Sequence, residues 1–501
     1  MTPADVDAVS RAEALLDAGR AAEAAALAAA PARAPDASHA ALSTYANALK
    51  AIGRREEALP FNRLAVQRYA TSQVAWHNLA ATLGDLGRSA ESRTAAEKAM
   101  ALGLDGWQTW LVYARALLAT TDGDGAERAY LECQRRAGGD PDVAIERANL
   151  TWMRHGDLKA AQAVLDNAFR EGGAPGKLVM AKARLFEAAG HGDDALRLLV
   201  MAAERMPDDV TVLMTAAHAA VEHRDIASAR RFADRGLALA PADPAALNQM
   251  AIVSLAAGDP EAALAFARQG LNIDPMHQSL AGWAATAARA CGDPLYGELY
   301  DYAAFVGAYD IDTPPGWPDL TAYLADLAKA LAPLHAYVQH PFHQSLRNGS
   351  QTAQALTAAT NPALAAFFTA IDEPIRTHMA RLGSGDDLHL RRNTGDYRIQ
   401  SSWSVSLRPG GFHNDHFHPE GWLSSAFYVE TPEQALATPA REGWLRFGQP
   451  PIPLDPPMPA ERFVRPQPGR LVLFPSYMWH GTVPFTTDES RMTIAFDAVP
   501  K

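Results

Sequence analysis

Cysteine is scarce in this sequence: Cys133 and Cys291 are the only two among 501 residues, and neither belongs to a Cys-x-x-Cys pair. A disulfide-bonded scaffold and a zinc site held by cysteines are therefore excluded, and the composition suits a reducing compartment. Apolar runs are also short, and none approaches the ~18 residues that a membrane-spanning helix needs. The alanine-rich stretch 21–30 follows acidic residues, whereas a secretory signal begins with basic ones. We therefore expect a cytoplasmic protein with no membrane partner.

Positively charged residues are fewer than negatively charged ones. The sequence has 45 Lys and Arg against 57 Asp and Glu, a net charge of −12. An acidic chain is a poor ligand for a polyphosphate, so nucleic acid is not an expected partner. Hydrophobic residues (48%) and charged residues (20%) occur at the levels of a folded globular protein, which excludes wholesale disorder. A chain of this length suits roughly two to four domains.

A unit of 34 residues repeats through the first three hundred positions. A turn residue returns at this spacing, with one step of 35, and a small residue follows five positions after each turn. A helix–turn–helix hairpin explains both features, because glycine permits a tight turn and a small side chain lets the second helix approach the first. Two units lack the turn glycine, which leaves the shape of their turns open. The turn positions are Gly19, Gly53, Gly87, Thr121, Gly156, Gly190, Arg224, Gly258 and Gly292.

This pattern resembles the tetratricopeptide repeat family over about residues 5–308, in about nine units. The resemblance implies an α-solenoid of stacked helical hairpins, because one hairpin cannot bury its apolar face alone. We expect the concave face to bind a protein or peptide partner, with a scaffolding or dimerising role as the alternative. Nothing in the repeats indicates catalysis, and they leave the oligomeric state open.

The pattern changes after residue 310. Prolines break the stretch 313–318, a helical lead-in without the repeat occupies about 319–385, and short alternating or apolar segments indicate strands from about 388 to 501. Such strands with proline turns favour a sandwich or jelly roll. We therefore predict a solenoid domain at 1–310 and an α+β domain at 311–501. Its strands are expected at 402–407, with only Trp403, Val405 and Leu407 buried, and at 425–430, 470–474 and 492–498, with the proline-rich stretch 431–465 as a long loop.

Histidines gather in the predicted strand region. Three of them occur within six residues, a fourth follows about sixty residues later, and an arginine stands eleven residues beyond it. Residues i and i+2 of an extended chain point to the same side, so two pairs could each supply two ligands to one metal. A distant histidine would supply the third, and open coordination positions would suit non-haem Fe(II). The pairs are His413 with Asp415 and His416 with His418, and the distant residues are His480 and Arg491.

Two sequence runs around these residues resemble the metal motifs of the 2-oxoglutarate and Fe(II) dependent oxygenase family. They are Gly411–Val429 and Leu473–Phe485, and with an upstream run, Gln344–Thr352, the resemblance covers about residues 335–500. It implies a double-stranded β-helix (jelly-roll) core that uses Fe(II), with 2-oxoglutarate as co-substrate, and O2. His480 corresponds to the distal metal ligand. Arg491 corresponds to the residue that binds the far carboxylate of 2-oxoglutarate, a role that suits a fixed guanidinium fork.

The proximal ligands remain a choice between two pairs. His413 and Asp415 fit the His-x-Asp motif of the wider oxygenase superfamily. His416 and His418, followed by Pro419, fit the His-x-His-Pro run of the family, and this longer match favours them. Asp415 would then act from outside the ligand set by orienting an imidazole.

The sequence thus predicts an Fe(II) and 2-oxoglutarate dependent dioxygenase. The simplest activity is that of a hydroxylase acting on a protein or peptide that the repeats recruit. The alternative is a repeat-based adaptor whose β domain is inactive or binds a metal without 2-oxoglutarate.

Overall fold

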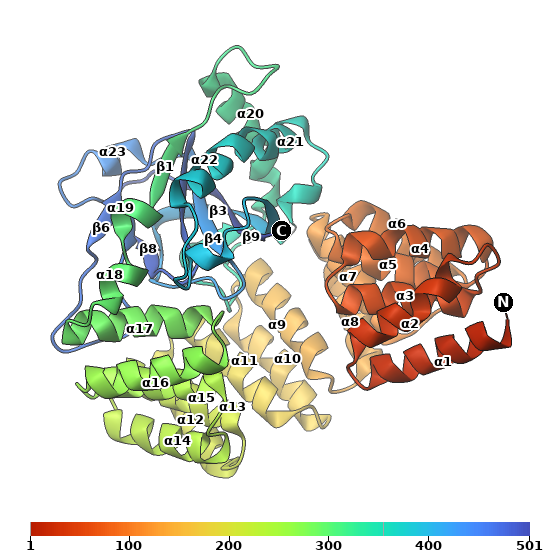
Figure 1. Cartoon of the computed structure of the whole chain (residues 1–501), viewed down its shortest axis with the longest axis horizontal. Coiled ribbons are helices and arrows are strands. Elements are labelled where there is room, and N and C mark those ends of the chain that lie inside the picture. Colours follow the sequence, from red (N-terminus) through yellow and green to blue (C-terminus); the bar gives the residue numbers. More distant parts are fainter. Residues whose placement is uncertain (1, 354) are drawn as a thin grey trace. The chain divides into compact units, whose positions relative to one another are not determined.

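The computed structural model of the protein describes residues 2–353 and 355–501. It divides into two compact units, Met1–Val143 and Ala144–Lys501 (Figure 1). The division falls within helix α9 (Pro141–His155), inside the repeats, and so does not test the predicted domain boundary between residues 310 and 311. Within the described residues, no helix combines the length and the apolar character needed to cross a lipid bilayer.

The first unit contains four helical hairpins, and side-chain caps start several of the helices. The hydroxyls of Ser38 and Ser72, for example, accept a hydrogen bond from the first turn of the helix that follows each of them. The hairpins are α1 (Pro3–Asp17) with α2 (Ala21–Arg33), α3 (His39–Ala51) with α4 (Arg55–Arg68), α5 (Gln73–Asp85) with α6 (Ser89–Ala101), and α7 (Trp107–Ala119) with α8 (Gly123–Ala137).

The second unit continues the same repeat. Its last hairpin is incomplete, because α18 is only five residues long. The repeat therefore makes eight full hairpins and a shortened ninth in the described chain. The elements are α9 with α10 (Leu158–Arg170), α11 (Pro175–Ala188) with α12 (Gly192–Arg205), α13 (Val210–Glu222) with α14 (Ile226–Leu239), α15 (Pro244–Ala256) with α16 (Pro260–Ile273), and α17 (Gln278–Cys291) with α18 (Leu295–Leu299).

The helix bounds confirm the predicted solenoid of stacked hairpins. The small residue after each turn is buried in the first eight units, whereas Gly297 of the shortened ninth is exposed. At the two turns that lack glycine, Thr121 (φ 61°) and Arg224 (φ 59°) adopt the same left-handed backbone as the glycines elsewhere. The turn shape is therefore kept at a strained position, and the repeat is not interrupted.

A six-stranded antiparallel sheet forms the larger half of the β domain. Its order is β1-β7-β4-β9-β3-β2, so its neighbours come from distant parts of the sequence. The strands are β1 (Gly307–Asp310), β2 (Leu346–Gln351), β3 (Tyr397–His413), β4 (Leu423–Glu430), β7 (Arg470–Pro475) and β9 (Arg491–Pro500).

A smaller antiparallel sheet of order β6-β5-β8 packs on one face of the large sheet. Phe447 of the small sheet lies 5.0 Å from Phe474 of the large one, between ring centroids. Helices cover the opposite face, where Phe367 contacts Phe427 at 4.9 Å. The small sheet is β5 (Leu445–Phe447), β6 (Arg462–Val464) and β8 (His480–Thr482), and the helices of the domain are α19 (Tyr302–Phe305), α20 (Leu320–Leu331), α21 (Pro362–Ala370), α22 (Asp372–Leu382) and α23 (Glu433–Leu436).

The two facing antiparallel sheets confirm the predicted double-stranded β core, with corrections of detail. The predicted loop 431–465 holds α23, β5 and β6, and the predicted helical lead-in holds β2. The burial of strand β3 differs from the prediction: Ser402 and Ser404 are buried, because Thr352 and Leu356 hydrogen-bond to them from that face, whereas Trp403 is only partly buried. The Ser404 hydroxyl donates to the Thr493 carbonyl at 2.8 Å, so it keeps a hydrogen-bond partner although it is buried.

Candidate metal centre

Backbone pairing brings three histidines together. His416 and His418 follow the end of β3, and His480 begins β8. The His416 amide donates to the His480 carbonyl at 2.9 Å, and the His480 amide donates to the His416 carbonyl at 3.0 Å. The His418 amide donates to the Ser476 carbonyl at 2.8 Å. The pair His416 and His418 thus lies on an extended segment after a strand, not within a strand as the sequence predicted.

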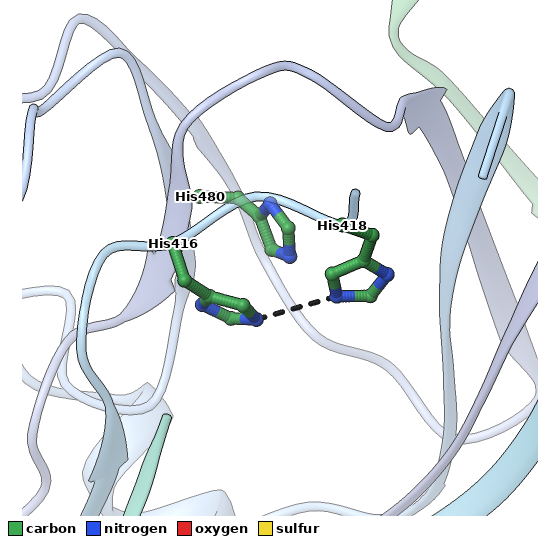
Figure 2. Close-up of side chains that lie close together, drawn as sticks. All are labelled: His416, His418 and His480. Carbon is green, nitrogen blue, oxygen red and sulfur yellow. Dashed lines mark hydrogen bonds between the residues drawn. The ribbon is translucent and has the colours of Figure 1, made fainter. Parts of the chain in front are cut away.

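The three imidazole rings turn toward one another (Figure 2). One nitrogen from each of His416, His418 and His480 lies within 4.8 Å of the others, and the Nε2 atoms of His416 and His418 are 3.3 Å apart. Two nitrogens bound to one ion at about 2.1 Å, at right angles, would lie about 3 Å apart. The spacing of these rings therefore fits a shared metal ion.

Hydrogen bonds determine which nitrogen of each ring carries its proton. The Nδ1 atom of His416 donates to the Asn414 carbonyl at 2.8 Å, and that of His480 donates to the Met478 carbonyl at 2.9 Å. The Nδ1 atom of His418 donates to the Asp497 carboxylate at 2.5 Å. A carbonyl or carboxylate can only accept, so each Nδ1 keeps its proton and each Nε2 is left with a lone pair. In their neutral forms the three rings therefore each direct an Nε2 lone pair toward the same point, which is the arrangement that a cation stabilises.

The surroundings also keep the rings of His416 and His480 neutral. Burial, together with the nearby His418, lowers the pKa of His416 to about 3. Burial and the neighbouring histidines likewise hold the pKa of His480 well below its usual value. Neutral imidazole is the form that binds metals.

Asp497 is the functional residue that sequence reasoning missed. Its carboxylate accepts from His418 Nδ1 and from the Ser424 hydroxyl at 2.7 Å. Burial alone would raise its pKa, but His418 and the hydroxyl donors hold it below the usual value. Asp497 therefore orients an imidazole, the role expected for Asp415. Alternation along β9 could have revealed it, since Asp497 lies six residues after Arg491 and so faces the same side.

The alternative pair lies beside this group rather than in it. Asp415 is 7% exposed and accepts two hydrogen bonds from the guanidinium of Arg446 in β5, at 2.9 and 2.7 Å. His413 stacks on His416 at 5.6 Å between ring centroids, and its Nδ1 is 3.0 Å from the Ser345 hydroxyl. The carboxylate of Asp415 is thus committed to an ion pair, while His413 lines the same cavity as the three histidines.

Arg491 reaches into this cavity from the first position of β9. Its side chain is 2% exposed, it lies over the Tyr428 ring at 5.0 Å, and one amino group donates to the Thr482 hydroxyl at 3.3 Å. Its Nε has no hydrogen-bond partner, and no carboxylate among residues 2–353 and 355–501 forms an ion pair with it. A buried guanidinium without an anion is costly, so the site is suited to an anionic ligand.

One cavity, partly open to solvent, joins these side chains. The three histidines and Arg491 share it with His413, and apolar side chains such as Val405 and Phe474 complete the wall. A metal ion and an anionic ligand bound here would therefore have one cationic side chain and several apolar ones around them.

The comparison with protein families bears on this part of the chain. Residues 401–497 match a family described as "Putative 2OG-Fe(II) oxygenase". This part of the C-terminal β domain is thus similar in sequence to that family, as the resemblance implied. The match includes the three histidines, Asp497 and Arg491, and does not include the upstream run Gln344–Thr352. Among curated proteins, none matches the chain.

Solved structures similar to the chain include several helical repeat proteins, at TM-scores of 0.40 or less. Yeast Tom70 matches at TM-score 0.40 and 15% identity, over 54% of this chain and 57% of that one. A tetratricopeptide repeat protein from Parabacteroides merdae matches at 0.36 and 12%, over 57% and 99%. The Cut9–Hcn1 assembly of the APC/C matches at 0.32 and 15%, over 56% of this chain and only 55% of that chain.

Proposed function

We propose that this protein is an Fe(II) and 2-oxoglutarate dependent dioxygenase, and that it hydroxylates a protein or peptide recruited by its helical repeats. The observation that carries the proposal is the combination in one cavity of three converging imidazole lone pairs and a buried guanidinium with no anion. The first feature calls for a cation and the second for a carboxylate, and Fe(II) with 2-oxoglutarate supplies both.

His416, His418 and His480 would hold the iron through Nε2. Three protein ligands leave open positions for substrates, as a catalytic metal requires. When bound, Fe(II) with 2-oxoglutarate would supply the oxidation of an unreactive C–H bond by O2, with succinate and CO2 as the co-products. Asp497 would keep the His418 ring oriented and its Nδ1 protonated.

Arg491 would bind the carboxylate of 2-oxoglutarate that lies far from the metal. A guanidinium pairs with a carboxylate through two parallel hydrogen bonds, and it stays charged when buried. The Thr482 hydroxyl, already 3.3 Å from the Arg491 amino group, would fix the fork in place. The apolar wall of the cavity would limit water around the reacting groups.

The repeats would supply the substrate. A stacked helical solenoid offers an extended surface for a protein segment. Helix α17, the last full helix of the solenoid, packs directly on the β domain in the second unit. A protein segment held by the adjoining repeats would therefore be kept near the cavity.

Anaerobic titration of the full chain with Fe(II) and then 2-oxoglutarate, followed by visible absorbance, tests the metal and co-substrate together. We expect a new absorption band only when both are present. Arg491→Lys keeps the charge but loses the fork, so the Kd for 2-oxoglutarate should rise about 10-fold or more while iron still binds. Arg470→Lys is the matched control, since Arg470 makes a two-bond pair with Asp310 at the far edge of the sheet.

The possible failures point to different alternatives. If the wild type binds no iron, the result favours the alternative that the protein is a repeat-based adaptor with an inactive β domain. If iron binds and Arg491→Lys leaves the Kd for 2-oxoglutarate unchanged, the β domain is a metal site that does not use this co-substrate through Arg491.

A further inference from the structure

A single buried indole contacts both chain segments that carry the three histidines. Trp479 immediately precedes His480, and its side chain is 2% exposed. Its ring and that of Phe417 lie 5.3 Å apart between centroids, at 89°. Phe417 stands between His416 and His418. Any displacement of this indole would therefore reach all three rings of the candidate metal centre.

The last repeat of the solenoid holds this indole. Its Nε1 donates to the Thr286 hydroxyl at 2.9 Å and to the Gly282 carbonyl at 3.2 Å, and its ring packs on Trp283 at 4.8 Å. All three residues belong to α17. The chain after α17 adds a further contact, because the Trp479 amide donates to the Tyr300 hydroxyl at 2.8 Å. Figure 1 shows α17 and α18 against the β domain.

Gly282 is favoured by this close packing rather than by the helix. It lies inside α17, where glycine is less favourable than alanine by about 1 kcal/mol. A Cβ atom there would approach the Tyr477 carbonyl oxygen to 3.0 Å and Cζ2 of Trp479 to 3.1 Å. Because one of these neighbours is backbone, the segment 477–480 would have to move to accommodate a methyl group.

We propose that α17, through Gly282, Trp283 and Thr286, is a positioning element of the metal centre. The β domain holds the backbone before His480 through hydrogen bonds to Ser476 and Trp479, and the last repeat adds the contacts that hold the Trp479 side chain. The two backbone hydrogen bonds between His416 and His480 then fix His416, and with it His418, relative to His480. This inference rests on the proposed function for the metal itself, but the placement of the three rings by α17 is a property of the metal-free protein as well.

The test uses Gly282→Ala and Thr286→Val in the full chain, titrated with Co(II) and followed by its visible spectrum. Loss of a group that orients a ligand weakens metal affinity about 10–100-fold, so we expect a loss in that range and altered Co(II) bands. The matched controls are Gly84→Ala and Thr82→Val in α5 of the first unit. Thr82 is also buried and hydrogen-bonded, to Asn62 at 2.8 Å, so its replacement reports the general effect of such a change. Both controls should bind Co(II) like the wild type.

Hydrogen–deuterium exchange of the metal-free protein provides a second measurement. In Gly282→Ala and Thr286→Val, peptides covering 414–418 and 477–482 should exchange faster than in the wild type and the controls. If the wild type binds Co(II) and both variants bind it equally well, the proposal is wrong. If the wild type binds no Co(II), the proposed function fails, and unchanged exchange in both segments would then overturn the positioning role separately.

Discussion

The helical repeats and the β domain respond differently to a departure from the expected residue. In the repeats, Thr121 and Arg224 replace the turn glycine, yet the backbone keeps its left-handed conformation. The following helices begin two residues later, as they do after the turn glycines of the other full hairpins. In the β domain, the candidate site draws on chain positions from 413 to 497, and each of its side chains occupies a position that no repeat supplies again. The difference teaches that a repeat spreads one structural requirement over many equivalent contacts, whereas a site assembled from distant segments has no substitute for any member.

The sharpest contrast should come from the ligands. We expect His480→Ala and His418→Ala to reduce Fe(II) binding by orders of magnitude, because each removes one of three converging nitrogens. Metal analysis of the anaerobically purified variants, with Fe(II) titration, measures the effect. Near-normal iron in either variant would contradict the ligand set proposed here.

Asp415→Asn is the counterpart that separates the two proximal pairs. Because Asp415 pairs with Arg446, this change should lower the free energy of unfolding, by about 3 kcal/mol, while iron remains bound. The opposite pattern, with iron lost in Asp415→Asn and kept in His418→Ala, would make His413 and Asp415 the ligands.

A change around the ligands should have an intermediate effect. Asp497→Asn keeps the shape of the side chain but removes the charge that holds the Nδ1 proton of His418. The affinity for Co(II) should fall about 10–100-fold, measured by titration at neutral pH. Ser401→Ala serves as the control, since its hydroxyl donates to the same carboxylate from outside the site, at 3.3 Å. Equal affinities in Asp497→Asn and the wild type would show that Asp497 has no part in orienting the ligand.

The sequence predicts the repeats better than the site, because the contacts of the repeats are local and those of the site are not. The repeats are local, so a 34-residue period defines their hairpins, including the buried residues such as Ala58 and Ala229. The motifs predict which histidines meet. They do not predict that Asp497, rather than Asp415, orients a ring, because that depends on how β9 lies beside His418. The contacts of Trp479 with α17 join residues nearly two hundred positions apart, which no local pattern contains.

A half-buried acid in the repeats should make stability depend on pH. Burial, and then the nearby Glu222, raise the pKa of Glu187 to about 7. In the unfolded chain this carboxyl has its ordinary pKa of 4.5, so the folded state loses stability as the pH rises from 4.5 to 7, and the loss stays constant above pH 7. Glu187→Gln should therefore stabilise the second unit at pH 8, by ~2 kcal/mol, and leave it unchanged at pH 4. Urea unfolding at both pH values measures this, and equal effects at the two values would contradict the shifted pKa.

The smallest expected effect lies at the turns that lack glycine. Thr121 is exposed and holds a left-handed φ of 61°, which costs a β-branched residue ~1–2 kcal/mol. Thr121→Gly removes this strain, and the greater freedom of the unfolded chain offsets part of the gain, so the net stabilisation should be ~1 kcal/mol. Thr94→Gly, at an exposed position inside α6, should instead destabilise the protein, because glycine is a poor helix former. Urea unfolding of the two variants compares the signs. If both changes destabilise the protein to the same extent, the turn at Thr121 carries no strain, and the tolerance of the repeats must come from the packing of the helices on either side.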